Sequence, residues 1–179
     1  MTKISAPTLG IVSRKAKEFL REETEQSLLA SVLLSISSLE IVLAYMLDLE
    51  LKIALLNICN ERIKKLESKK LLRGYNLDKI INKVSIRNGA TLGEMIDHIE
   101  KYLAFPEKEE LLNMLIIVND TRNKVVHNTL KLYEKNSKPI TYIRKLAQTI
   151  SINADKAIDL SFAISERSSN ANLPEELLK

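Results

Sequence analysis

The chain has 179 residues, and its 27 basic and 23 acidic side chains leave a net charge of +4, which permits an anionic partner without demanding one. Apolar residues make up 45% and charged residues 28%, which excludes a disordered chain. Four glycines and four prolines are too few for the turns of a β-sandwich or barrel, and the single cysteine, Cys59, excludes an intrachain disulfide framework. These counts favour an all-α protein.

The expected elements begin with a leader and two long helices. Pro7 and Gly10 interrupt residues 1–12, which we expect to form the leader. No glycine or proline follows until Gly74, and apolar residues recur at helical spacing over this span. The pattern predicts a first helix over 13–47 and a second over 49–72. Serines in the first helix form a strip of small residues that is typical of close helix packing. They are Ser27, Ser31, Ser35 and Ser38.

Four further helices are expected after Gly74. Thr91 and Glu94 have the spacing of a capping box, and Pro106 suits the first turn of a helix. The expected helices cover 77–87, 91–103, 106–134 and 139–167. Residues 168–179 form a polar tail. We therefore predict one domain over 1–179, an up-and-down all-α bundle of five or six helices with its core within 13–167.

The N-terminus and the most apolar segment predict where the protein is located. Residues 1–10 lack the apolar stretch of a signal peptide. The longest uncharged apolar stretch, 26–39, is shorter than a membrane-spanning helix, and charged residues follow it. We expect a cytoplasmic protein that has no membrane partner.

The expected helix 106–134 carries a polar cluster beside apolar residues. With Arg122 placed at 0° on a helical wheel, Asn119, Asn123 and His127 follow at about 60°, 100° and 140°. Asn123 lies one turn before His127 and can orient its imidazole, while Arg122 matches the oxygens of a phosphate. This set suits phosphodiester transesterification. A hydrogen-bonded polar layer inside a bundle core is the alternative.

The segment Arg122-Asn123-Lys124-Val125-Val126-His127 resembles the signature of the HEPN superfamily (higher eukaryotes and prokaryotes nucleotide-binding), in which a polar residue follows the arginine and histidine comes four positions later. The general resemblance covers about 25–167, and only the six-residue motif is sharp. It implies a four-helix core that dimerises so that two motifs face each other. Many members are metal-independent endoribonucleases of toxin–antitoxin or antiviral systems.

The resemblance also implies roles for individual residues. By position, Arg122 and His127 would be the catalytic pair and Asn123 a supporting residue. One subgroup of HEPN toxins has a tyrosine two residues after the histidine, which a partner nucleotidyltransferase can modify. Thr129 occupies that position here, which argues against neutralisation by that route.

The chemistry itself favours a homodimer. Attack by a 2′-hydroxyl needs a base, an acid and a cation, whereas one protomer offers one arginine and one histidine on this helix face. The other histidine, His98, is interpreted as structural or solvated. Two-fold symmetry would supply two copies of both groups. We expect no metal and no cofactor, and an antitoxin or a defence-complex protein as a possible partner.

A basic segment is the candidate landing surface for RNA. The segment from Arg62 to Arg87 contains nine basic and two acidic side chains. Its net charge of +7 would attract phosphates. The candidates are Lys64, Lys65, Lys69, Lys70 and Arg73. A solvated bundle end explains the same charges equally well.

Two other functions remain open at the level of sequence. A HEPN domain that only binds a nucleotide would have the same fold but would not cleave RNA. A helical interaction or scaffold protein would use the polar cluster only to set pairing specificity.

Overall fold

The computed structural model describes residues 6–22, 24–67, 89–135 and 139–167. These residues form five α-helices, which confirms the predicted all-α class. The helices are α1 (Ala6–Glu22), α2 (Glu25–Glu67), α4 (Leu92–Tyr102), α5 (Lys108–Lys135) and α6 (Pro139–Arg167). The expected helix 77–87 and the polar tail 168–179 lie outside the described residues.

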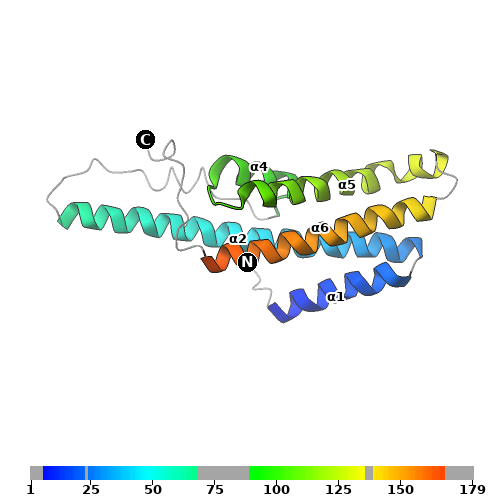
Figure 1. Ribbon diagram of the computed structural model, residues 1–179, viewed down its shortest axis with the longest axis horizontal. Coiled ribbons are helices and arrows are strands. Elements are labelled where there is room, and N and C mark those ends of the chain that lie inside the picture. Colours follow the sequence, from blue (N-terminus) through cyan, green and yellow to red (C-terminus); the bar gives the residue numbers. More distant parts are fainter. Residues whose placement is uncertain (1–5, 23, 68–88, 136–138, 168–179) are drawn as a thin grey trace.

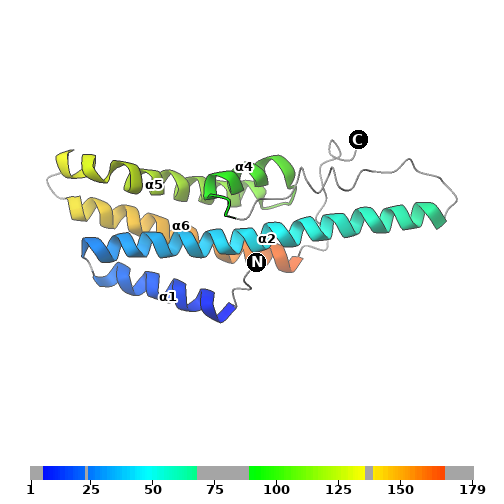
Figure 2. The ribbon, with the colours of Figure 1, turned by 180° about the vertical axis from the view of Figure 1, so that it is seen from behind.

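The four long elements run alternately up and down, as predicted (Figure 1). The helix α6 packs against α2 on one side and α5 on another, while α1 packs against α2 and also touches α6. The shorter α4 lies against the first half of α5 and contacts α2. The C-terminal part of α2 extends beyond the other helices in both views (Figures 1 and 2).

Each packed helix contributes to one hydrophobic core. Fully buried side chains include Leu43 of α2, Ile99 of α4, Leu115 of α5 and Ile150 of α6. The serine strip of α2 is buried, which confirms its expected role in close packing. The exposed fractions are 4% for Ser27, 0% for Ser31, 7% for Ser35 and 2% for Ser38.

The first helix boundary differs from the prediction. Residues 6–12 are not a leader, because Ala6–Gly10 already belong to α1. Pro7 is tolerated in a first helical turn, where the backbone N–H has no partner within the helix. The predicted helix 13–47 is also wrong, because α1 ends at Glu22 and the chain reverses before α2.

A reciprocal capping arrangement explains where α2 begins. The backbone N–H of Ser27 donates to Thr24 Oγ1 at 3.1 Å, and the N–H of Thr24 donates to Ser27 Oγ at 3.0 Å. These bonds satisfy donors that a helix start leaves unpaired. The predicted boundary at 47–49 is absent, since α2 continues unbroken to Glu67.

The predicted capping box at the start of α4 is confirmed. Thr91 Oγ1 accepts from the N–H of Glu94 at 3.4 Å, and Glu94 Oε2 accepts from the N–H of Thr91 at 2.7 Å. Gly89 just before it has a φ of +75°, a conformation that glycine adopts without strain. Glu40 of α2 accepts from the N–H of Leu92 at 3.2 Å, so a carboxylate lies at the positive end of α4.

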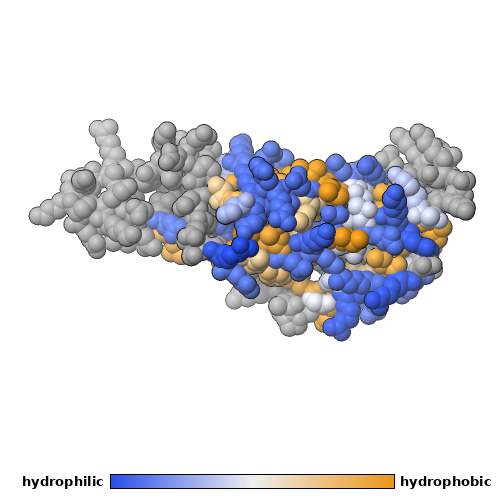
Figure 3. Space-filling model, in the orientation of Figure 1, coloured by the Kyte–Doolittle hydropathy of each residue, from blue (hydrophilic) through white to orange (hydrophobic). Residues whose placement is uncertain are grey.

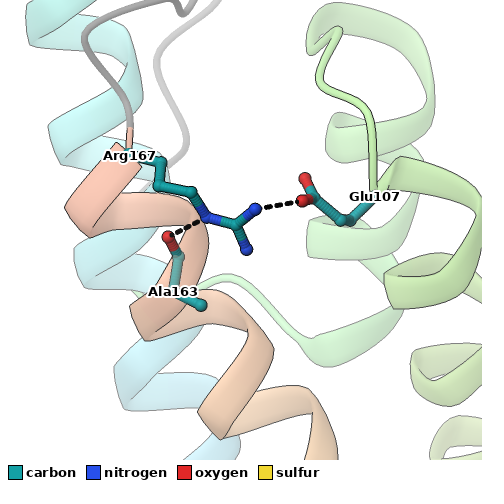
Figure 4. A network of polar contacts seen from close by, with 3 residues as sticks. All are labelled: Glu107, Ala163 and Arg167. Carbon is teal, nitrogen blue, oxygen red and sulfur yellow. Dashed lines mark hydrogen bonds and ion pairs between the residues drawn. The ribbon is translucent and has the colours of Figure 1, made fainter.

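Polar contacts also fix the other end of α4 and the end of α6. Lys108 Nζ donates to the carbonyls of Glu100 and Leu103 at 2.5 and 2.8 Å, which joins the end of α4 to the start of α5. Arg167 donates through its Nε to the carbonyl of Ala163 at 3.1 Å, and its guanidinium contacts Glu107 at 2.6 Å (Figure 4). The end of α6 is thus tied to the turn before α5.

The apolar part of α2 is longer than expected. By length and composition Glu25–Glu50 could cross a membrane, so the prediction that the apolar stretch of this helix is too short to do so is wrong. In its most apolar window, 56% is buried inside the bundle. A core helix passes the same test, so the length of this stretch does not identify a membrane helix.

Candidate functional site

The central part of α5 has two adjoining faces that differ in burial. One face is buried in the core through Leu111, Leu115, Val118 and Val125. The adjoining face carries Leu112, Ile116, Asn119 and Asn123, which lie three or four residues apart. Ile116 is 44% exposed, and the other three are half-buried. Asn119 and Asn123 therefore flank the buried face and do not lie within it.

By helical angle, Arg122 lies on the buried face of α5, between Leu111 and Leu115. Its side chain is half-buried, and no hydrogen bond or ion pair joins it to another residue in the described part of the chain. Asn119 and Asn123 are likewise half-buried and make no side-chain hydrogen bond to residues that the structure describes. A closed polar layer would pair these groups with one another or with other helices. In the described residues, the arginine and both amides retain their capacity to bind a ligand.

His127 belongs to α5, one turn beyond Asn123. The register of the helix therefore places Arg122 and Asn123 next to each other in one turn of α5 and His127 in the following turn. The side chain of His127 lies outside the described part of the structure, and so does its expected hydrogen bond with Asn123. Lys124, next to Asn123, is exposed.

Apolar side chains interrupt the hydrophilic surface over α5 and α6 (Figure 3). On α5 the exposed large apolar residues in the described part are Ile116 at 44% and Ile117 at 43%. Consecutive helical residues point about 100° apart, so only Ile116 shares the face of Asn119 and Asn123. The apolar spacing of this helix in the sequence gives no sign that Ile116 is exposed.

The basic segment lies far from the α5 cluster within one protomer. Lys64 and Lys65 belong to the last turns of α2, and the end of α2 lies at the opposite end of the molecule from the C-terminal half of α5 (Figures 1 and 2). Lys69, Lys70 and Arg73 lie outside the described residues. The described fold of one protomer does not bring the two candidate sites together.

His98 has a structural environment on α4. Its ring lies 4.9 Å from the ring of Tyr102, centroid to centroid, in a tilted arrangement. Burial lowers the pKa of His98 from its ordinary value, because the charged imidazolium loses hydration. This placement agrees with the structural interpretation of His98. His98 belongs to α4 and is not part of the polar cluster on α5.

The described residues contain no group of three or more histidine, cysteine or carboxylate side chains able to hold a metal ion. No family model, curated protein or solved structure matches this chain.

Proposed function

We propose that the protein is a metal-independent endoribonuclease that cleaves single-stranded RNA by attack of the 2′-hydroxyl. Arg122 and His127 are the catalytic pair in this proposal, and Asn123 positions the imidazole. The active site is composite and forms where two copies of α5 meet in a homodimer. The motif's resemblance to the HEPN superfamily supports a role as a toxin or phage-defence effector, with an antitoxin or defence-complex protein as its regulator.

The observation that carries the proposal is the half-buried Arg122 side chain, which no described residue pairs with. A half-buried guanidinium without a partner in the described residues is costly to keep, because it loses part of its hydration and gains no counter-charge. A phosphate would supply both the charge and the two oxygens that a guanidinium binds. Asn119 and Asn123 offer further hydrogen bonds from the same side of α5.

The proposed chemistry divides four groups between two protomers. One His127 takes the proton of the 2′-hydroxyl, whose oxygen attacks the adjacent phosphorus. The second His127, or water, gives a proton to the leaving 5′-oxygen as its bond to phosphorus breaks. The two Arg122 guanidinium groups neutralise the charge that develops on the phosphorane. The products carry a 2′,3′-cyclic phosphate and a free 5′-hydroxyl.

The homodimer is supported by Ile116. An exposed isoleucine one turn before Asn119 gives the polar face of α5 an apolar border, and burial of such side chains stabilises protein interfaces. A two-fold axis near this face would bring both motifs into one cleft.

The test uses single-stranded RNA in EDTA together with a matched substrate that has 2′-deoxyribose at the cleavage position. We expect the RNA to be cut in EDTA to products with cyclic phosphate ends, and the deoxy substrate to stay intact. Loss of cleavage in EDTA, or cleavage of the deoxy substrate, contradicts the mechanism.

Expression in cells separates this proposal from the two non-catalytic alternatives. We expect the wild type to slow growth and His127→Ala to leave growth unchanged at equal protein level. A scaffold or a nucleotide-binding domain predicts instead that the purified wild type cuts no RNA.

A further inference from the structure

A cavity of about 360 Å³ lies between α1, α2 and α6, away from the polar face of α5. Residues of all three helices line it. They include Lys17 of α1, Ser38 and Val42 of α2, and Asp155, Asp159 and Phe162 of α6. Its volume is at the lower end of the range for small-molecule sites. None of these residues takes part in the proposed ribonuclease chemistry.

The charges at this cavity favour a cation. Lys17 Nζ lies 2.9 Å from Asp155 Oδ2, so these two charges neutralise each other. Asp159 is one turn further along α6, is exposed, and has no ion pair or hydrogen bond to any residue that the structure describes. One negative charge therefore remains among the lining residues.

An aromatic ring lies next to that charge. Phe162 is three residues after Asp159 on α6, which places both on one side of the helix, and its side chain is 40% exposed. An aromatic face beside a carboxylate is the arrangement that binds organic ammonium groups. Val42 and Ile158 supply an apolar wall that would exclude a strongly hydrated metal ion.

A buried hydroxyl gives the second, independent observation. Ser38 is 2% exposed and lines the cavity, and no residue that the structure describes forms a hydrogen bond with its Oγ. A buried polar atom without a partner is uncommon and costs stability. A ligand with a hydroxyl or amide group would satisfy it.

We propose that this cavity binds a small organic ammonium compound that also carries a hydrogen-bonding group. The cation lies against Asp159 and Phe162, and the hydrogen-bonding group reaches Ser38 Oγ. The site is distinct from the ribonuclease proposal and stands or falls without it.

The probe is choline, and its control is the neutral isostere 3,3-dimethylbutan-1-ol, which has the same shape and hydroxyl without the charge. Both are titrated into the full chain, and chemical shifts are followed by nuclear magnetic resonance. We expect choline to shift signals of residues that line the cavity and to bind about tenfold more tightly than the isostere. Equal affinities, shifts elsewhere, or no shifts with choline overturn the proposal.

Matched variants identify the groups that act. Asp159→Asn should weaken choline binding about tenfold and leave the isostere unaffected, because only the charge is lost. Glu166→Gln, an equal change of charge at an exposed position of α6 outside the cavity, should leave binding unchanged. Ser38→Ala should weaken both ligands without lowering the melting temperature, since it removes an unpaired hydroxyl. Wild-type affinity for choline in folded Asp159→Asn overturns the proposal.

Discussion

Arg122 combines a half-buried position with a charge that no described residue neutralises. Lys124, two positions later, has the same charge and is exposed to solvent. These two residues can be compared within one helix. Exchanging arginine and lysine keeps the charge but changes the shape of the cationic group, and this exchange should affect cleavage only at a position that binds the substrate.

Arg122→Lys tests that comparison. A lysine keeps the charge and loses the planar fork that binds two phosphate oxygens, so we expect cleavage to slow by about a hundredfold. The free energy of unfolding should change by less than about 1 kcal/mol. Lys124→Arg should change neither quantity. Rates on a fluorescent RNA and urea denaturation measure the two effects, and an unchanged rate in Arg122→Lys would remove the phosphate clamp from the mechanism.

His98 makes stability depend on pH. Because burial lowers its folded-state pKa, the neutral ring contributes stability above the unfolded pKa near 6.5, and this is lost as the pH falls through the folded pKa. We expect the free energy of unfolding to fall from pH 7 to pH 5, and to fall less in His98→Phe, which keeps a ring beside Tyr102. Urea denaturation at each pH measures both slopes, and identical slopes would refute this role.

The sequence predicts the start of α4 but not the start of α2, and the difference lies in the capping residues of each helix. Thr91 and Glu94 follow the common Ser/Thr-x-x-Glu pattern, so the start of α4 could be recognised. Thr24 and Ser27 make a similar reciprocal pair, but serine in place of glutamate removes the usual signal. The apolar spacing also continues across this point, which concealed the reversal between α1 and α2.

Thr24→Ala tests whether this cap positions the α1–α2 turn. Without the hydroxyl, the N–H of Ser27 loses its acceptor, and we expect the free energy of unfolding to fall by about 1 kcal/mol. Gln26→Ala, at an exposed position of the same turn, should cost much less. Chemical denaturation of both variants measures the difference, and equal stabilities would mean that packing alone sets the turn.

For the whole molecule, composition and periodicity were enough to predict the all-α bundle, because sparse glycine and proline leave few other folds. Composition and periodicity do not predict which distant segments contact each other. The exposure of Ile116 depends on which neighbours cover α5, and the cavity depends on residues from α1, α2 and α6. A helical wheel of a single helix predicts neither the exposure of Ile116 nor the cavity.

Dimerisation through α5 can be tested with two adjacent isoleucines. Ile116 and Ile117 are 44% and 43% exposed, but only Ile116 shares the face of Asn123. A buried charge at an interface is costly, so Ile116→Glu should yield monomers without ribonuclease activity, while Ile117→Glu stays dimeric and active. Sedimentation velocity measures the states. A monomeric wild type, or equal effects of the two substitutions, would contradict the composite site.

The central claim is that Arg122 and His127 cut RNA. The most direct measurement compares RNA cleavage in EDTA by the wild type, Arg122→Ala, His127→Ala and the exposed control Lys124→Ala, each shown to be folded by circular dichroism. We predict that the wild type and Lys124→Ala release fragments ending in 2′,3′-cyclic phosphate, and that Arg122→Ala and His127→Ala release none. Cleavage by either of these two variants at the wild-type rate would contradict the claim.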